Sequence, residues 1–332
     1  MTVLQGGRRA DRPHRARRRL LDGIVALALA AVALLVLMAS RAEGPATSPF
    51  HGPVIVPAPR TVPAKLPARS SYAITSAPAR EQVTVKHKLR LRSGLLFDVN
   101  TGQLLWARNP ARVMPMASLT KMMTALIVAG HAKPGARVLI TSEALHYTGS
   151  GIGLLPKGKR VPLPALLYGL LLPSGNDAAI ALADYVAGSQ SRFIALMNQR
   201  AHDLGLSCTH FSTVSGIVDQ GNYSCAQDLA LIARKLLDQP LLAAIVASRN
   251  AILPFPIKGG KLYLYTNNPL LLLRYPGADG VKTGFTDAAG QCLVATARRG
   301  KRWLGVVLLH SGDTSTQAQQ LLNAGFAKLP KS

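Results

Sequence analysis

The chain has 332 residues, of which 48% are hydrophobic, and this content is sufficient for a large folded core. Its formal net charge is +24, but the first 92 residues hold 16 Lys/Arg against 4 Asp/Glu, so half of that charge lies in this segment. A chain that is disordered throughout is therefore excluded. Because the basic charge is concentrated at one end and aromatic residues make up only 5%, nucleic-acid binding is not expected either.

A cluster of arginines between residues 8 and 19 precedes an uncharged apolar run from Ile24 to Ala39. This order indicates that segment 24–40 enters a membrane and that residues 1–23 stay in the cytoplasm. The length of the run falls between the core of a signal peptide and a full membrane span, and the small residues Ser40 and Ala42 fit a cleavage site. We expect an uncleaved anchor, with a removed signal peptide as the alternative. In both cases the rest of the chain lies outside the cytoplasm.

Residues 41–87 are rich in proline and alanine, with eight prolines between Gly44 and Ala79. Proline fixes φ and lacks a backbone N–H donor, so this stretch favours an extended polyproline II conformation. We expect a linker between the membrane segment and a globular domain of residues 88–330.

The globular part shows β-like patterns at both ends and helical patterns between them. The expected strands are Leu91–Val99, Gln103–Ala107, Leu262–Tyr265, Gly280–Thr283, Cys292–Ala297 and Leu304–His310. The expected helices are Ser118–Val128, Leu163–Leu172, Asn176–Val186, Ser191–Leu204, Ala226–Leu237 and Thr316–Phe326. This order predicts an α+β domain in which N- and C-terminal strands form one antiparallel sheet, flanked by helices and interrupted by a helical insertion.

Three cysteines are too few for a disulfide framework. Cys208 and Cys225 flank a loop-rich stretch, and a disulfide between them or two separate thiols fit the sequence equally well. Cys292 lies in an apolar run and is expected in a buried strand. The histidines show no metal-ligand spacing, so a histidine metal site is not expected.

Three short motifs carry reactive side chains. In chain order they are Ser118-Leu119-Thr120-Lys121, Ser174-Gly175-Asn176 and Lys282-Thr283-Gly284. Each motif alone is a weak signal, and their order and context carry the weight.

Ser118 and Lys121 are three residues apart, which places them on one face of a helix with the amine within reach of the hydroxyl. A lysine can accept a proton only if its charged form is destabilised, and apolar neighbours such as Met122 together with a nearby cation such as Lys282 would do this. The pattern predicts that Ser118 is a nucleophile and Lys121 its base. The alternative is a helix-capping serine followed by a solvent-exposed lysine.

The second motif follows an apolar helix, and Gly175 allows a sharp turn after which Ser174 can relay a proton and Asn176 can orient a carbonyl or the lysine. The alternative is a second helix cap. The third motif lies on an expected strand that can bind an extended peptide.

In this third motif Lys282 and Thr283 would meet a substrate carboxylate, and Gly284 would allow close backbone approach. The following Phe285 offers a backbone N–H group. The alternative is an edge-strand lysine that precedes a turn.

Together and in this order, the motifs resemble the active-site set of penicillin-recognising serine enzymes. Over about residues 90–327 the chain is similar to low-molecular-weight D-alanyl-D-alanine carboxypeptidases. The segments that carry the resemblance are Leu96–Asp98 with Gly102, Met116–Ala125, Leu171–Ala179 and Asp279–Thr286. The resemblance implies a β-lactamase/DD-peptidase-like fold and removal of the terminal D-alanine from peptidoglycan stem peptides through an acyl-enzyme, which penicillins also form.

The resemblance also implies roles for the motif residues. They are nucleophile for Ser118, proton acceptor for Lys121, proton relay for Ser174, positioning for Asn176, carboxylate binding for Lys282 and Thr283, and an oxyanion hole from the N–H groups of Ser118 and Phe285. No metal or cofactor is implied. Asn267 stands where many relatives carry an arginine, so recognition of the carboxylate would depend more on the third motif.

Two alternatives remain for the function. A class A β-lactamase deacylates with a glutamate, and this chain has only Glu43, Glu81 and Glu143, none of them after the second motif. A non-catalytic wall-binding or β-lactam-sensing module could keep the same fold. The intact set of serines and lysines argues against that alternative.

Overall fold

The structure is a computed structural model that describes residues 74–328 except His87, Ala132 and Pro134. The expected cytoplasmic segment 1–23, the membrane segment 24–40 and the linker as far as residue 73 lie outside the described residues. No helix within the described part is both long enough and apolar enough to cross a membrane.

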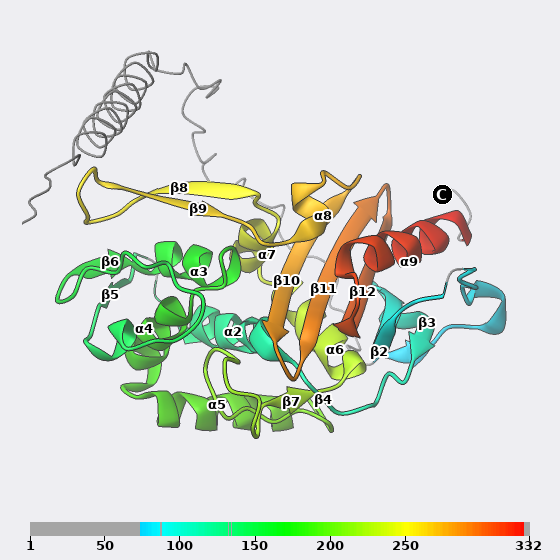
Figure 1. Cartoon of the computed structure of the whole chain (residues 1–332), viewed down its shortest axis with the longest axis horizontal. Coiled ribbons are helices and arrows are strands. Elements are labelled where there is room, and N and C mark those ends of the chain that lie inside the picture. The colour runs from blue at the N-terminus through cyan, green and yellow to red at the C-terminus, as the bar shows by residue number, and fades with distance from the viewer. Residues whose placement is uncertain (1–73, 87, 132, 134, 329–332) are drawn as a thin grey trace, which may run out of the picture. The chain divides into compact units, whose positions relative to one another are not determined.

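The main sheet has six strands in the order β1-β3-β2-β12-β11-β10 (Figure 1). Their bounds are β1 Thr75–Ser76, β2 Leu91–Asp98, β3 Gln103–Arg108, β10 Ala278–Thr286, β11 Gly290–Arg299 and β12 Arg302–Ser311. The N-terminal β2 pairs with the C-terminal β12, with Leu96 opposite Val306. The sheet is therefore assembled from both ends of the chain, as predicted, and all of its pairings are antiparallel except that of β1 with β3.

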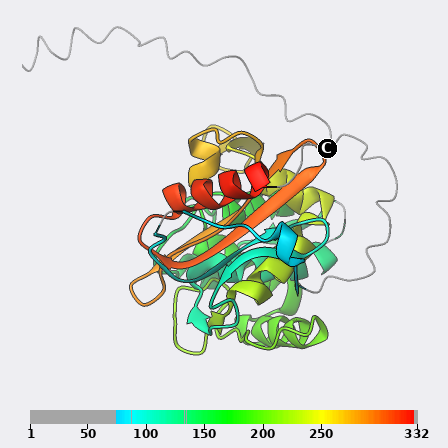
Figure 2. The same ribbon diagram turned by 90° about the vertical axis from the view of Figure 1, so that its right-hand side faces the viewer.

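Both faces of this sheet are buried. In β2, Leu95 and Phe97 belong to the core on the side of the helical insertion, whereas Leu96 belongs to a second core that includes Leu321 and Leu322 of the C-terminal helix α9 (Thr314–Lys328). Successive side chains of a strand point to opposite faces, which explains why these strands have continuous apolar runs instead of an alternating pattern. Figure 2 shows α9 against the sheet, with the helical layer behind it.

The middle of the chain supplies this helical layer. Its helices are α2 Lys121–His131, α3 Leu163–Leu171, α4 Asn176–Ala187, α5 Gln190–Asp203, α6 Ala226–Leu237 and α7 Pro240–Val246. The short elements are η1 Ala79–Glu81, η2 Ala117–Thr120, η3 Glu143–Leu145 and α8 Pro269–Leu272. Three two-stranded pairs complete the fold, β4 Met114–Pro115 with β7 Tyr223–Ser224, β5 Arg137–Leu139 with β6 Arg160–Pro162, and β8 Asn250–Pro254 with β9 Lys261–Tyr265.

The packed part of the chain starts before Lys88. β1 pairs with β3, and Ala77 and Val83 are buried in the core beneath α9, so the end of the expected linker belongs to the folded part. The expected helix at Ser118 is also different, because its first turn is the 3-10 turn η2 and the α-helix begins at Lys121.

The structure contains a disulfide between Cys208 and Cys225, which was one of the two alternatives that the sequence left open. Cys292 is a buried free thiol on β11, as expected. The disulfide closes residues 209–224 into a loop that lies beside the start of α2.

Candidate active site

Ser118 lies in the 3-10 turn η2, directly before α2. In a 3-10 turn the side chains at i and i+3 eclipse one another, so Lys121 stands over Ser118. The Lys121 Nζ atom lies 2.9 Å from Ser118 Oγ, at hydrogen-bond distance. Ala117 precedes the serine with a φ of 49°, in the left-handed region. This conformation turns the chain sharply from β4 into η2, which we call the nucleophile turn.

The Lys121 amine has three polar neighbours. Besides Ser118 Oγ, it donates to Asn176 Oδ1 at 2.7 Å and to the backbone carbonyl of Ser215 at 2.8 Å. A neutral amine has two N–H groups and one lone pair, so the two carbonyl-type acceptors can take both N–H groups. The lone pair then faces the hydroxyl of Ser118, which is the arrangement that a general base requires.

Electrostatics favour this neutral form of the lysine. The side chain of Lys121 is fully buried. Burial, and secondly the charge of Lys282, hold the pKa of Lys121 well below its usual range, while Asp177 acts in the opposite direction. The sequence-based expectation of a desolvated lysine beside a second cation is thus met by the geometry.

Asn176 begins α4 and points its amide at the lysine. Its Nδ2 atom donates to the carbonyl of Thr148 at 2.5 Å, and this contact leaves Oδ1 facing Lys121. The neighbouring carboxylate of Asp177 accepts hydrogen bonds from the N–H groups of Ile152 and Gly153 at 2.9 and 3.0 Å. The start of α4 therefore fixes both the lysine and the loop that precedes β6.

The third motif lies on β10, which passes beside the nucleophile turn. A Cβ atom on Gly284 would lie 3.1 Å from the nitrogen of Ser118 and 3.1 Å from the carbonyl oxygen of Met116, so a side chain at this position would crowd the backbone that precedes and includes Ser118. Lys282 is buried and donates to the carbonyl of Thr283 at 2.8 Å. Burial lowers the pKa of Lys282 to about 7.

A cavity of about 440 Å³ opens beside Ser118, between β10 and the end of α3. The described residues that line it are uncharged, and they are Ser118, Ser150, Ser174, Asn267, Pro269, Thr283, Gly284, Phe285, Gln291, Cys292 and Thr314. Ser174 lies in the turn between α3 and α4, and its own backbone has a φ of 69°, in the left-handed region. All three motifs, distant in the sequence, therefore meet at one cavity.

The sequence did not indicate the contribution of the disulfide-closed loop. Besides the carbonyl of Ser215, this loop brings Gly216 so close to the nucleophile turn that a Cβ atom there would lie 2.0 Å from the carbonyl oxygen of Ala117. Ser150, Gln291 and Thr314 on the cavity wall were also missed. The carbonyl of Ser215 could come from any residue type, so the sequence does not mark it as an acceptor. Gly216 was the one sign in this loop that two backbone segments approach closely.

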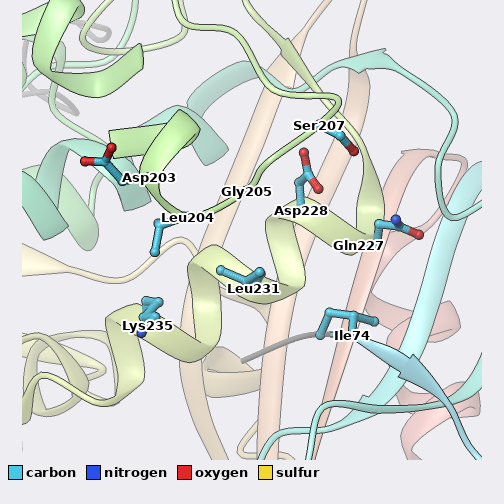
Figure 3. Close-up of a pocket in the computed structure, with 9 residues that line it drawn as sticks. All are labelled: Ile74, Asp203, Leu204, Gly205, Ser207, Gln227, Asp228, Leu231 and Lys235. Carbon is cyan, nitrogen blue, oxygen red and sulfur yellow. The ribbon is translucent and has the colours of Figure 1, made fainter. Parts of the chain in front are cut away.

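A second hollow of about 430 Å³ contains none of the motif residues (Figure 3). It lies beside α6, with Asp228 and Lys235 on its wall. Cys208, Cys225 and Asp228 form the one cluster of potential metal ligands found among the described residues. Because both sulfur atoms belong to the disulfide, this cluster is not available to a metal.

Comparison with known proteins agrees with this geometry. The family model of the Peptidase S11 group, described as D-alanyl-D-alanine carboxypeptidase, matches residues 79–312. The carboxypeptidase DacF of Bacillus subtilis is 34% identical over 242 residues, and DacA of Escherichia coli is 37% identical over 249 residues. These matches cover 71% and 70% of this chain but only 61% and 60% of the relatives, so the chain spans less than two thirds of their length.

Solved structures show the same fold. A DD-transpeptidase of Streptomyces is 32% identical, with a TM-score of 0.69 over 74% of this chain and 100% of that chain. A D-alanyl-D-alanine carboxypeptidase of Mycobacterium tuberculosis is 31% identical, with a TM-score of 0.69 over 75% of this chain and 96% of that chain. The predicted α+β fold is thereby confirmed, and with 234 consecutive residues (79–312) inside the family model the chain belongs to the D-alanyl-D-alanine carboxypeptidase family of serine peptidases.

Proposed function

We propose that the chain is a serine D-alanyl-D-alanine carboxypeptidase that removes the terminal D-alanine from peptidoglycan stem peptides. The observation that carries this proposal is the buried, pKa-lowered Lys121, whose amine is hydrogen-bonded to Ser118 Oγ and to two further acceptors. Membership of the family and the names of the relatives support the substrate class.

In the proposed acylation, the lone pair of Lys121 takes the proton of Ser118 Oγ while Oγ attacks the carbonyl carbon between the two D-alanines. The backbone N–H groups of Ser118 and Phe285 stabilise the oxyanion. The proton held by Lys121 then passes through the hydroxyl of Ser174 to the departing nitrogen, so that D-alanine leaves as a neutral amine, Ser174 keeps its own proton count and Lys121 is neutral again. Water then attacks the ester on Ser118, Lys121 takes one of its protons, and this proton passes to Ser118 Oγ as the shortened peptide leaves with the new carboxyl group.

The substrate carboxylate would bind at the third motif. The cavity wall carries no charged side chain, so the charge comes from Lys282 behind it, whose pKa of about 7 would rise when an anion binds nearby. The hydroxyl of Thr283 supplies a donor on the cavity wall. Asn267, which lines the same cavity, provides an amide where many relatives carry an arginine.

We further propose that the catalytic domain lies outside the cytoplasm and is attached through residues 24–40. The arginine cluster before the apolar run supports this topology, and so does the disulfide, since such bonds persist in oxidising compartments. Fusions of residues 1–73 to a reporter that works on only one side of the membrane would test it. Activity of the downstream reporter in the cytoplasm would contradict the topology.

The test of the enzymatic proposal is acylation by a labelled penicillin, followed by peptide mapping. We expect one stable adduct on Ser118, and release of D-alanine from a peptide that ends in D-Ala-D-Ala. A penicillin that is bound and rapidly hydrolysed would instead favour a β-lactamase. No adduct would favour a non-catalytic wall-binding or β-lactam-sensing module.

A further inference from the structure

Residues 209–224 form a loop whose ends are joined by the Cys208–Cys225 disulfide, and we call it the cystine loop. It has little regular structure apart from β7, yet its inner residues are buried, including Phe211, Val214 and Ser215. A loop that runs under the surface must place its backbone polar groups on specific partners. Asn198 of α5 pairs with both backbone groups of Phe211, and further partners lie in the nucleophile turn and at the start of α2.

Three hydrogen bonds connect the cystine loop to the end of the nucleophile turn and the first turn of α2. Lys121 Nζ donates to the carbonyl of Ser215 at 2.8 Å, and Thr124 Oγ1 donates to the carbonyl of Val214 at 2.7 Å. The amide Nδ2 of Asn222 donates to Thr120 Oγ1 at 2.8 Å. The loop thus contacts the residues on both sides of the proposed base.

The base of the cystine loop is tied to α6. The buried carboxylate of Asp228 accepts hydrogen bonds from the N–H group of Cys208 at 2.9 Å and from Thr209 Oγ1 at 2.7 Å. Figure 3 shows Asp228 beside Ser207 on the wall of the second hollow. The disulfide is the covalent part of this base, and it limits how far the two ends of the loop can separate.

The acceptor that the cystine loop offers to Lys121 is the backbone carbonyl of Ser215. The position of this carbonyl depends on the conformation of the loop and not on the side chain of Ser215. If this carbonyl moves away, one N–H group of the neutral amine loses its acceptor. The amine can then rotate, and its lone pair no longer faces Ser118. An open loop would also admit water to a lysine that is now fully buried.

We propose that the Cys208–Cys225 disulfide is a positioning element of the active site, which holds the carbonyl of Ser215 against the Lys121 amine through the cystine loop. The disulfide touches neither substrate nor the reacting atoms, and it acts through Lys121. This inference rests on the proposed acyl-enzyme function. It predicts that full activity requires the oxidised protein.

Removal of the disulfide should therefore change the chemistry of the lysine as well as stability. Burial is the largest cause of the lowered pKa of Lys121, so entry of water would raise that pKa toward its usual value. The other charged groups that act on this amine are Lys282 of β10, which lowers its pKa, and Asp177 of α4, which raises it. Neither belongs to the cystine loop, so both effects would remain.

The experiment compares the full-length wild type with the double variant Cys208→Ser, Cys225→Ser. The rate constant of acylation by a labelled penicillin is measured as a function of pH. At pH 7 we expect a fall of about tenfold or more, within the range typical of a mispositioned general base, with the lower limb of the profile moved to higher pH. A profile that superimposes on that of the wild type would overturn the inference.

Two further measurements cover a variant that fails to fold. The oxidised wild type is reduced under native conditions, its free thiols are counted by alkylation and mass spectrometry, and its acylation profile is then recorded. Gly216→Ala, which keeps the disulfide but forces the loop away from Ala117, should give the same shift of the profile. Unchanged profiles in both measurements would likewise refute the role of the loop.

The matched control is Tyr275→Phe, which removes the hydrogen bond from the Tyr275 hydroxyl to Asn323 Oδ1 at 2.7 Å, away from the active-site residues. It should lower stability without moving the pH profile of acylation. Failure of the wild type to form any adduct would contradict the proposed function itself. A reactive wild type with an unaltered disulfide variant would contradict only the positioning inference.

Discussion

Two buried lysines, Lys121 and Lys282, determine the electrostatics of the site. Each pays a desolvation penalty for its charge, and the charge of Lys282 lowers the pKa of Lys121 further. A neutral Lys121 serves as a base, whereas Lys282 is useful for binding a carboxylate when it is protonated. The two lysines of the motifs therefore need opposite protonation states, and a pKa of about 7 leaves Lys282 partly protonated at neutral pH.

Lys121→Ala should abolish acylation by penicillin while the fold remains intact. Loss of a general base costs about a hundredfold to ten-thousandfold in rate, and here the nucleophile also loses a hydrogen-bond partner at 2.9 Å. The measurement is the acylation rate constant, with circular dichroism and thermal unfolding to verify the fold. Acylation at the wild-type rate would refute the assignment of Lys121 as the base.

Lys282 also predicts how stability depends on pH. Its pKa of about 7 in the folded state lies below the usual 10.5, so between these values the unfolded chain binds more protons than the folded chain. The free energy of unfolding should accordingly rise with pH across this window, and the destabilising effect of Lys282 should be complete below pH 7. Urea titrations at several pH values, compared with Lys282→Met, measure this contribution. Equal slopes for wild type and variant would contradict it.

At this scale the sequence could indicate which side chains lie together, but it could not indicate their backbone partners. Ser118 and Lys121 could be paired because their spacing alone places them on one face of a turn. Ser215 could not be found, because its carbonyl acts through a contact across 94 residues and any residue type could supply it. The rule that buried polar groups need partners demands such an acceptor but does not locate it.

Among the elements, α6 connects the helical layer to the sheet through one buried arginine. The guanidinium of Arg234 donates to the carbonyl of Val99 at 2.9 Å and to that of Asn100 at 3.0 Å, in the turn after β2. These carbonyls lie at the end of a strand where the sheet ladder no longer supplies donors. The helix α6 thus supplies donors to the turn between β2 and β3.

Arg234→Leu should lower the free energy of unfolding by about 3 kcal/mol, because hydrogen bonds from a charged donor are lost and two carbonyls lose a partner. The rate of acylation of the folded variant should stay close to that of the wild type, since Arg234 lies outside the active-site cavity. Urea unfolding measures the loss. The exposed Arg192→Leu serves as the control, and a comparable loss for both variants would contradict the argument.

Long elements with strong apolar patterns could be predicted from the sequence, and most short ones could not. The helix expected at Ala226–Leu237 has these bounds in the structure. By contrast, the pair β5–β6 and the strand β8 were missed, because short strands have few positions to show a period. The short strand β9, expected at Leu262–Tyr265, is an exception, because leucine and tyrosine make up the whole segment. The 3-10 turn at Ser118 was also missed, since hydrogen-bond type leaves no trace in a pattern of apolar residues.

On the scale of the described molecule, the three-layer arrangement places a strand from its first part beside a strand from its last part in the middle of the sheet. β2 and β12 are neighbours in the sheet, and the helical layer and α9 cover their two faces. The active site lies at the border between the sheet and the helical layer, where β10 meets the nucleophile turn. The sheet supplies Thr283, the helical layer supplies Ser174, and α9 supplies Thr314 to the wall of the cavity.

β10 is the last strand in the order of the described sheet, and Phe285 on this strand is 63% exposed. The carbonyl of Gly280 already accepts a hydrogen bond from Asn268, but the part of the strand near Phe285 borders the cavity, where an extended chain can pair with it; another copy of the same protein is one such chain. Concentrated solutions should therefore contain dimers joined through β10 that are poor in acylation. Sedimentation with and without bound penicillin tests this, because a ligand seated along β10 should dissolve the dimer. At high protein concentration, self-association would then compete with an extended peptide substrate for the same strand.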